Sequence, residues 1–444
     1  MLFQLISDTH GRFENVKWDQ KADIILAAGD ISENIDKSIK FLLTSPVPVI
    51  YIAGNHEYYK ADFLNRNAYI KEQCDKTNGH ITFLDKNVAI LPGVRILGST
   101  LWSDFNNFDS ILVDAAEGLI NDYFYINAGS IRSDKEWLKQ INKLDALHER
   151  ARRFFYLQGG IYKNLIEAQY IIRQRKLNLS QSQIECFNYK ERFSPSISYL
   201  LHKQNFHWLE KTLSKPFDGE TIVMTHHAPS KTALSLSGFS ISPYSLDLNP
   251  YINNKLSTYK IGAYVSPMES LVSKYQINAW VHGHLHNKML YRMGSTVVHC
   301  NPTGTQKDNH SLLGSPTYSF DTGSDFKTLS LYNHINHCLN ISKGLLKWYE
   351  SAQNDFRIKD KLCETRSFVG IWEEFSVPIN SLLMMPLAEL PDKHNIHTAN
   401  SLHSMVEKNV LTCSASIISK SIEENIQKIK IAIDYLHYWN SKIK

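Results

Sequence analysis

The stretch MLFQLISDTH at residues 1–10 sets the pattern on which the predicted fold rests: an apolar run that ends directly in polar side chains. The same arrangement returns in IILAAGD at 24–30 and in VIYIAGNHE at 49–57. Far downstream, TIVMTHH at 221–227 and NAWVHGHLH at 278–286 repeat it. Continuous apolar runs of this length are typical of strands that are covered on both faces. We therefore predict a layered sheet whose strand ends carry the functional groups.

Further short apolar runs extend this pattern through the first part of the chain and return after residue 220. We expect strands at residues 2–6, 23–28, 47–52, 81–84, 88–91, 95–98, 221–225, 279–281, 296–299 and 328–332. Helical patterns at 37–43 and 61–74 lie between strands, and such alternation indicates an α/β fold. Pro92-Gly93 suggests a hairpin between neighbouring strands. We therefore expect layered, mixed β-sheets flanked by helices.

The chain has 444 residues, about three times the usual length of one domain, so more than one folding unit is expected. We place an α/β domain at residues 1–332 and an α-helical extension at 333–444, where comparable strand signals are absent. Near the end of the extension, an apolar stripe has three- and four-residue spacing and consists of Ile418, Ile422, Ile426, Ile429, Ile433 and Leu436. Such a stripe indicates a packed helix, or else a surface that binds a partner protein or a second copy of the chain.

The positive charge is concentrated in one segment. The formal net charge of the whole chain is +4, which is too small to signal a nucleic-acid or membrane partner by itself. Residues 139–192, however, carry eleven Lys or Arg against five Asp or Glu, a net +6, and their pattern is helical. This insertion is either a pair of solvent-exposed helices or a basic lid that attracts a polyanion.

Cysteine usage and hydropathy indicate in which cellular compartment the protein is expected. The six cysteines are scattered and form no CxxC pair, which favours reduced thiols over disulfides or a zinc site. An apolar stretch near residue 380 is interrupted by Pro378 and Pro386 and is too short to cross a bilayer. The sequence opens directly into the first expected strand, without a signal segment. We expect a cytoplasmic protein that does not associate with membranes.

Five polar blocks follow the apolar runs. They are Asp8-Thr9-His10, Gly29-Asp30, Gly54-Asn55-His56-Glu57, His226-His227 and His282-Gly283-His284-Leu285-His286. Because the carboxyl ends of strands in an open α/β sheet border one crevice, we expect these blocks to converge there. Their imidazoles and carboxylates form a nitrogen and oxygen ligand set without sulfur. The blocks therefore indicate a metal centre.

The number of ligand-type residues favours two ions over one. Neighbouring buried carboxylates repel each other unless cations neutralise them. One ion would leave several good ligands unused, whereas two ions about 3.5–4 Å apart, sharing a carboxylate and a hydroxide, would use them all. Taken singly, each block also has an ordinary explanation, such as a turn at Gly29-Asp30 or core packing of His226-His227. The order of all five blocks is what carries the prediction.

The five blocks resemble the calcineurin-like metallophosphoesterases, whose pattern is D-x-H, G-D, G-N-H-[DE], a single His and G-H-x-H. The phrases GNHEYY, GSTLWSDF, THHAPS, and WVHGHLHN followed by VVHCNPTG are similar to a bacterial branch of small phosphoesterases. The resemblance covers roughly residues 1–135 and 195–330. It implies a hydrolase that acts on phosphoric ester bonds, with the calcineurin-like fold.

The resemblance also implies roles for individual residues. One metal would bind Asp8, His10, Asp30 and His286, and the other would bind Asp30, Asn55, His226 and His284. A hydroxide between the ions would attack phosphorus, and His56 would bind the phosphoryl group or protonate the leaving oxygen. Glu57 would orient His56. Glu33 stands where many members have Asp, and we expect it to tune the site without binding metal. His227 is expected to touch substrate or to pack.

These patterns also indicate which cofactors and substrates to expect. We expect two divalent ions, manganese first, with Fe, Zn, Co or Ni also suited to such ligands. The favoured substrate is a phosphomonoester or phosphodiester of nucleotide type. If residues 139–192 lie beside the metals, the enzyme is instead a nuclease acting on DNA or RNA. A third hypothesis is an interaction module, in which residues 333–444 bind a partner.

Overall fold

The computed structural model describes residues 1–158, 191–233, 263–305, 314–322, 430 and 434. The chain forms two compact units, the first made of residues 1–230, 250–289 and 298–324, and the second of residues 231–249, 290–297 and 325–444. The strand expected at 328–332 and the apolar stripe of the extension lie outside the described residues. The domain boundary expected at residue 332 stays a prediction.

The first sheet has five strands in the order β11-β1-β2-β3-β4. Its members are β1 (Phe3–Ile6), β2 (Ile24–Ala27), β3 (Val49–Tyr51), β4 (Ile81–Phe83) and β11 (Ser319–Phe320). Strands β1 to β4 run parallel, and β11 pairs with β1 antiparallel. Every residue of β1, β2 and β3 is buried, as continuous apolar runs require.

The second sheet has six strands in the order β5-β6-β7-β8-β10-β9. Its members are β5 (Asn87–Leu91), β6 (Val94–Ser99), β7 (Glu220–Thr225), β8 (Ala279–His282), β10 (Thr296–Cys300) and β9 (Met289–Met293). The hairpin expected at Pro92-Gly93 joins antiparallel β5 and β6, while β6, β7 and β8 run parallel. The prediction of mixed sheets in an α/β fold is confirmed.

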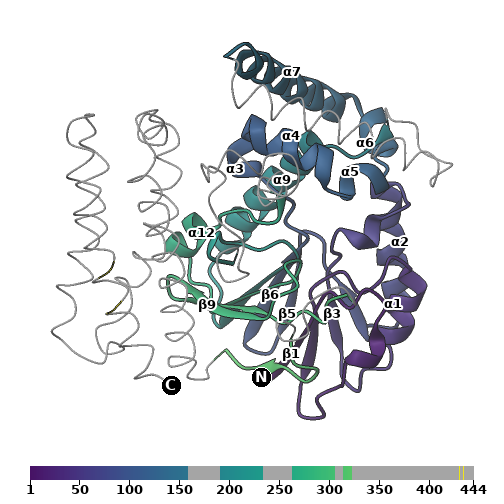
Figure 1. The fold of residues 1–444 in the computed structure, drawn as a ribbon. Helices are drawn as coiled ribbons and strands as arrows, with labels where there is room; N and C mark the ends of the chain where they lie inside the picture. The colour runs from purple at the N-terminus through teal and green to yellow at the C-terminus, as the bar shows by residue number, and fades with distance from the viewer. Residues whose placement is uncertain (159–190, 234–262, 306–313, 323–429, 431–433, 435–444) are drawn as a thin grey trace. The chain divides into compact units, whose positions relative to one another are not determined.

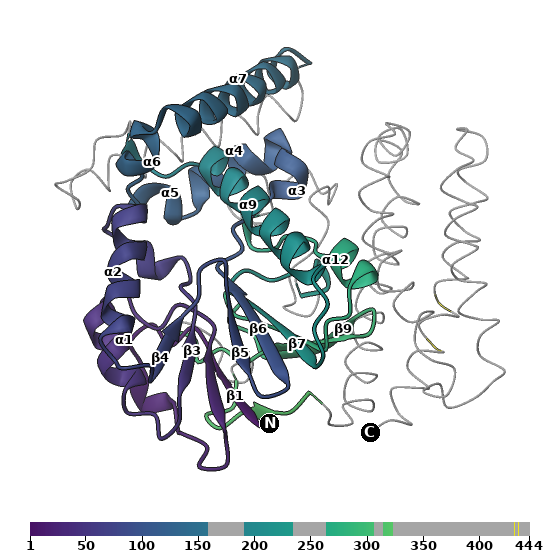
Figure 2. The same cartoon turned by 180° about the vertical axis from the view of Figure 1, so that it is seen from behind.

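The two sheets lie against each other (Figures 1 and 2). Gly98 of β6 permits this approach, because a Cβ there would lie 2.8 Å from Cδ1 of Leu84 and 2.9 Å from Cγ2 of Ile52. Both of those residues adjoin the first sheet. A larger residue at position 98 would hold the sheets apart, and the strand ends of the two sheets would no longer face one another.

Two capped helices cover the outer side of the first sheet, α1 (Ile35–Leu42) and α2 (Phe63–Asp75) (Figure 2). The side chain of Asn34 accepts a hydrogen bond from the backbone of Lys37 and caps α1. In the same way, Asp62 accepts from the backbone of Asn65 and caps α2. Both helices therefore begin at defined residues just after the strand ends of β2 and β3.

A helical layer begins earlier than the basic segment suggested. It contains α3 (Phe105–Phe108), α4 (Ser110–Leu119), α5 (Asp122–Tyr125), α6 (Gly129–Ser133), α7 (Lys135–Gln158) and α9 (Pro195–Leu213). In both views α4 and α9 lie between α7 and the sheets (Figures 1 and 2). Lys139, Lys143 and Arg150 of α7 are exposed. Residues 139–158 of the basic insertion thus lie on a helix that exposes these charges to solvent, and residues 159–190 lie outside the description.

Candidate metal centre

The predicted ligands come together at the carboxyl ends of β1, β2, β3, β7 and β8. Their donor atoms form three overlapping groups, in each of which all atoms lie within 4.8 Å of one another: Asp8, His10 and His286; His10, Asp30 and His56; and Asp30, His226 and His284. Asn55 joins the last group, because its Oδ1 lies 3.1 Å from both Nε2 of His226 and Nδ1 of His284. Five segments distant in sequence therefore build one cluster.

The backbone turns sharply at most of these ligands. Five of them adopt the left-handed conformation, with φ between 46° and 71°: Asp8, His10, Asp30, His284 and His286. This conformation is costly for residues other than glycine and persists only where surrounding contacts enforce it. Here the Asp8 amide donates to the carbonyl of Gly29, and the His284 amide donates to Oδ1 of Asp8. The fold thus holds the ligands in strained turns that aim them at one place.

Glycines beside the ligands make room for side chains from the opposite sheet. A Cβ on Gly29, whose φ is +88°, would lie 2.6 Å from Nδ1 of His226. A Cβ on Gly54 would lie 2.6 Å from Cε1 of the same ring. On Gly283, it would lie 2.6 Å from Oδ2 of Asp8. Only glycine lets the imidazole and the carboxylate pass so close to the neighbouring backbone.

Two buried donor atoms indicate that the cluster can bind a cation. Oδ2 of Asp8 and Nε2 of His284 are buried and have no hydrogen-bond partner among the described residues. In addition, Nε2 of His10 lies 3.0 Å from Nε2 of His286. Burying an unpaired carboxylate oxygen is costly, and native proteins pair such atoms or place them on a metal. The donor set of imidazoles, carboxylates and one amide oxygen therefore fits divalent cations.

Asp30 occupies the centre of the cluster. Its Oδ2 lies 3.4 Å from Nε2 of His226 and 3.8 Å from Nε2 of His10, which belong to different donor groups. Burial alone would raise the pKa of Asp30, but the neighbouring imidazoles, first that of His226, lower the pKa well below its usual value. The carboxylate is therefore charged and stands where a ligand shared by two cations is expected.

The imidazoles of the cluster differ in protonation. Burial lowers the pKa of His10 to about 4, and burial also lowers the pKa of His284 well below its usual value. Both rings are therefore neutral at pH 7 and have a lone pair for a metal. His226 differs from them: burial would lower its pKa, but Asp30 raises the pKa to about 10, so both ring nitrogens carry a proton. Its Nδ1 lies 2.8 Å from the carbonyl oxygen of Ala28, and its Nε2 faces Asp30, where a bound cation would replace the Nε2 proton.

His56 lies at the edge of the cluster and is partly open to solvent. Its side chain is 27% exposed, whereas those of Asp30 and His226 are 1% and 0% exposed. Burial would lower the pKa of His56, but Asp30, and after it Glu33, raise the pKa to about 9. The imidazole is therefore protonated at neutral pH. A charged donor at the open side of a metal cluster suits contact with an anionic substrate.

Glu57 does not orient His56, contrary to the expectation from the motif. Its buried carboxylate accepts hydrogen bonds from the backbone amides of Asp30, Ile31 and Gly54 at 2.7–2.9 Å, and from the hydroxyl of Tyr51 at 3.0 Å. The chain turns after Asn55, so that neighbouring side chains point in different directions. Glu57 therefore joins the loops that follow β2 and β3.

Glu33 takes the position beside His56 instead. Its Oε1 lies 3.8 Å from Nδ1 of His56, and its Oε2 lies 2.9 Å from Nζ of Lys60. The contact with His56 lowers the pKa of Glu33 to about 2; burial opposes this shift, and Lys60 adds to it. The carboxylate is thus charged at neutral pH and holds one edge of the protonated imidazole. The ring of Tyr59 stacks on His56 with centroids 4.2 Å apart.

His227 packs inside the molecule, the second of the two alternatives expected for it. Its side chain is buried, and its ring centroid lies 4.4 Å from that of His284 and 5.4 Å from that of Trp102. Burial lowers the pKa of His227 to about 3, so the ring is neutral. His227 therefore supports a ligand ring.

Asp122 is a residue of the site that the sequence patterns did not reveal. It is buried in α5, and its Oδ1 accepts hydrogen bonds from Nδ2 of Asn55 and from the hydroxyl of Tyr59, both at 2.8 Å. The first bond fixes the amide of Asn55 so that its oxygen faces His226 and His284. No motif surrounds Asp122 in the sequence, so only its spatial position identifies it.

The chain belongs to the calcineurin-like phosphoesterases, whose family model matches residues 1–288. It is a metal-dependent phosphoesterase and thus a hydrolase of phosphoric esters. A comparison with curated proteins finds no match. Among solved structures, the chain is similar to a phosphopantetheinyl hydrolase from Mycobacterium tuberculosis, at 13% identity and a TM-score of 0.41, covering 70% of this chain and 94% of the other. Among the described helices, none is long and apolar enough to span a bilayer.

Proposed function

We propose that this enzyme binds two divalent cations and hydrolyses a phosphomonoester or phosphodiester of nucleotide type. The observation that carries the proposal is the pair of donor groups on either side of Asp30, one with His10 and the other with His226. The unpartnered donor atoms of Asp8 and His284, one in each outer group, support occupancy of both. Manganese is the first candidate, because the ligands combine carboxylate and amide oxygens with imidazoles.

Each residue of the cluster then has a defined task. Asp8, His10 and His286 would hold one cation, Asn55, His226 and His284 would hold the other, and Asp30 would contact both. When bound, such cations lower the pKa of coordinated water and offset the negative charge of phosphoryl oxygens. His56, protonated and held by Glu33, would donate a hydrogen bond to a phosphoryl oxygen and then its proton to the leaving oxygen.

A small phosphoester is favoured over a nucleic acid by the place of the basic insertion. Its described part, α7, lies beyond α4 and α9 as seen from the sheets (Figures 1 and 2). The charges of α7 that could attract a polyanion therefore do not line the metal cluster. A nuclease remains a measurable alternative, because its activity would fall steeply with rising salt as counterion release is lost.

The proposal is tested with a panel of phosphoesters in the presence of Mn²⁺: mononucleotides, cyclic nucleotides, dinucleotides and nucleic acids. We expect Asp30→Ala and His284→Ala each to lower kcat/KM by about a thousandfold, because each loses a direct contact with the proposed cations. His207→Ala is the matched control, since His207 is exposed on α9. Full metal-dependent activity in both site variants would contradict the ligand assignment.

A further inference from the structure

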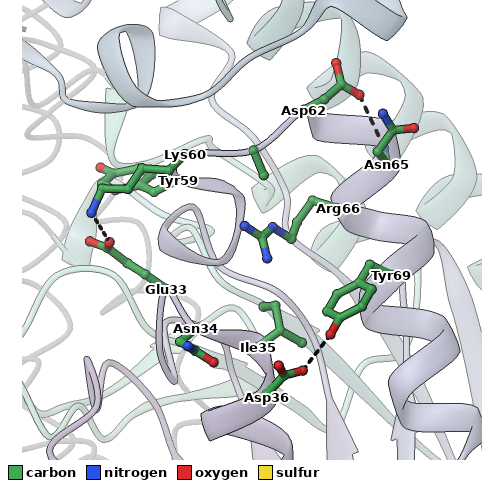
Figure 3. Close-up of a pocket in the computed structure, with 11 residues that line it drawn as sticks. Glu33, Asn34, Ile35, Asp36, Tyr59, Lys60, Asp62, Asn65, Arg66 and Tyr69 are labelled. Atoms are coloured by element: carbon green, nitrogen blue, oxygen red, sulfur yellow. Dashed lines mark hydrogen bonds and ion pairs between the residues drawn. The ribbon is translucent and has the colours of Figure 1, made fainter. Parts of the chain in front are cut away.

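A cavity of about 590 Å³ lies between the first turns of α1 and α2 (Figure 3). Its lining includes the polar residues Glu33, Asp36, Lys60, Asp62, Arg66 and Tyr69. None of these residues belongs to the predicted metal ligands. The cavity is therefore a separate space in the same unit of the structure.

The cavity shares a wall with the metal centre. Glu33 and Tyr59 line the cavity, and both contact His56 from that side: Glu33 at 3.8 Å from Nδ1, and Tyr59 by stacking on the ring. The opposite nitrogen of His56, Nε2, lies 3.9 Å from Oδ2 of Asp30. His56, Glu33 and Tyr59 thus lie between the cluster and the cavity, so a leaving group that extends past His56 would reach this space.

Most polar groups in the cavity already have partners. Lys60 pairs with Glu33 at 2.9 Å, and Asp36 accepts a hydrogen bond from the hydroxyl of Tyr69 at 2.6 Å. Asp62 caps α2 and accepts a hydrogen bond from the backbone amide of Ser130 at 3.0 Å. These contacts satisfy the carboxylates within the protein, which leaves little reason for a cation to bind there.

Arg66 differs from these residues because the described side chains around it form no ion pair with it. Its guanidinium points into the cavity, away from the backbone of α2 (Figure 3). Its Nε is buried and has no hydrogen-bond partner within the described part of the chain. Although Asp36 and Asp62 line the same cavity, neither forms an ion pair with Arg66. A half-buried guanidinium of this kind offers a planar set of donors that matches the oxygens of a phosphate group.

We propose that this cavity binds a second phosphate group, carried by the leaving group of the substrate, and that Arg66 is its main ligand. This inference rests on the proposed phosphoesterase activity and narrows the substrate to phosphoesters whose leaving group is itself phosphorylated. The scissile phosphoryl group lies at the metal cluster, and the second phosphate lies on the far side of His56. The two phosphate groups would thus bind on either side of the His56 imidazole.

The test compares two substrates that differ by one phosphate, adenosine 3′,5′-bisphosphate and adenosine 5′-monophosphate, with the full-length, Mn²⁺-loaded protein. We expect the wild type to show at least a tenfold higher kcat/KM for release of the 5′-phosphate from the bisphosphate, since a charge-assisted bidentate contact is lost with the monophosphate. Arg66→Gln should bring the ratio of the two kcat/KM values close to one. Lys71→Gln is the matched control, because Lys71 lies on the same helix and is paired with Asp75 outside the cavity.

The other possible results contradict either the inference or the proposed function. A wild type without preference for the bisphosphate, or an Arg66→Gln variant that keeps the preference, overturns the inference. If Arg66→Gln does not fold, Arg66→Lys replaces it and should lower the ratio at least threefold, because the charge stays while the planar fork is lost. If the wild type hydrolyses no phosphoester, the proposed function fails. Calorimetric titration of the same two nucleotides then tests the cavity alone, and equal affinities overturn the inference.

Discussion

The two sheets contribute different chemistry to the cluster. The first sheet supplies both carboxylates, Asp8 and Asp30, together with the imidazole of His10, while the second sheet supplies only imidazoles, those of His226, His284 and His286. Neither set contains all the ligands predicted for either cation. The groups of the first sheet alone would leave two carboxylates buried close together, and the imidazoles of the second sheet alone would have no negative charge to offset a cation. On the proposed ligand assignment, metal binding and the packing of the two sheets are coupled.

The largest effect is expected from Asp30, the ligand predicted to contact both cations, in comparison with His226, which is predicted to contact one. Asp30→Ala should remove both cations, because the Asp30 carboxylate lies in reach of both donor groups, whereas His226→Ala should leave one. Metal content of the purified variants, measured by elemental analysis after loading with Mn²⁺ and desalting, reads this directly. Two ions retained by Asp30→Ala would show that the first sheet does not hold the shared ligand.

A smaller effect is expected from Asp122, which would act on a bound metal through its hydrogen bond to Asn55. Asp122→Ala should weaken metal binding by about ten- to a hundredfold, the usual loss when a partner of a ligand is removed. Asp122→Asn should recover part of this affinity, because its amide oxygen still accepts from Asn55. The measurement is a titration with Mn²⁺.

Asp114→Ala provides the control for that titration. Asp114 is also buried, but it pairs with Arg152 on α7 at 3.2 Å. Its replacement should lower stability and leave the affinity for Mn²⁺ unchanged. Equal losses of affinity in the Asp114 and Asp122 variants would mean that general destabilisation, and not the position of Asn55, explains the effect.

Glu57 tests the loops of the first sheet without touching a metal. Glu57→Gln should lower the free energy of unfolding by about 1–3 kcal/mol, because an amide group then faces backbone donors and leaves them unpaired. Urea unfolding of the metal-free protein measures this. Among the described residues, the second sheet has no equivalent of Glu57. If Glu57→Gln were as stable as the wild type, Glu57 would not stabilise the loops of the first sheet, and this difference between the sheets would have no effect on stability.

The last effect concerns a contact between the sheets beyond the predicted ligand set. His299 of β10 stacks on Phe320 of β11 with centroids 4.0 Å apart, and burial lowers its pKa to about 3. In the unfolded chain its pKa is about 6.5, so the unfolded state binds the extra proton below that value. The contribution of His299 therefore lowers the free energy of unfolding as the pH falls from 6.5 towards 3, by about 1.4 kcal/mol per pH unit.

Replacing His299 with Phe should remove that contribution. The free energy of unfolding, measured in urea between pH 6 and pH 4 without metal, should fall less steeply in His299→Phe than in the wild type. The difference in slope is the measured quantity, since other buried histidines contribute equally to both proteins. Identical slopes would show that His299 is not kept neutral at the contact between the sheets.

The strands were predictable wherever an apolar run is long enough to be buried on both faces. The runs around residues 24–27 and 221–225 are examples, and their observed ends differ from the predicted ones by a residue or two. Strand β9 (Met289–Met293) was missed because its run contains Arg292. Strand β11 was missed because its two residues become a strand only by pairing with Phe3 and Gln4.

The short helices between residues 105 and 133 were also missed. Helices of four or five residues, such as α5 and α6, are too short to show a helical period in the sequence. This omission hid Asp122, which lies in α5. The expectation for Glu57 was wrong for a related reason: adjacency in the sequence suggested contact with His56, but the turn after β3 directs the two side chains apart.

The sequence by itself determined the α/β fold, the family and the set of ligand-type residues, because each block directly follows a buried run and such local patterns are visible in one dimension. Only the tertiary structure decided which residues support these side chains and what lies beside them. Asp122 positions Asn55 across 67 residues, and Arg66 faces a cavity that two helices enclose together. Contacts of this kind depend on how separate segments pack, and their energies are gained only once the chain has folded.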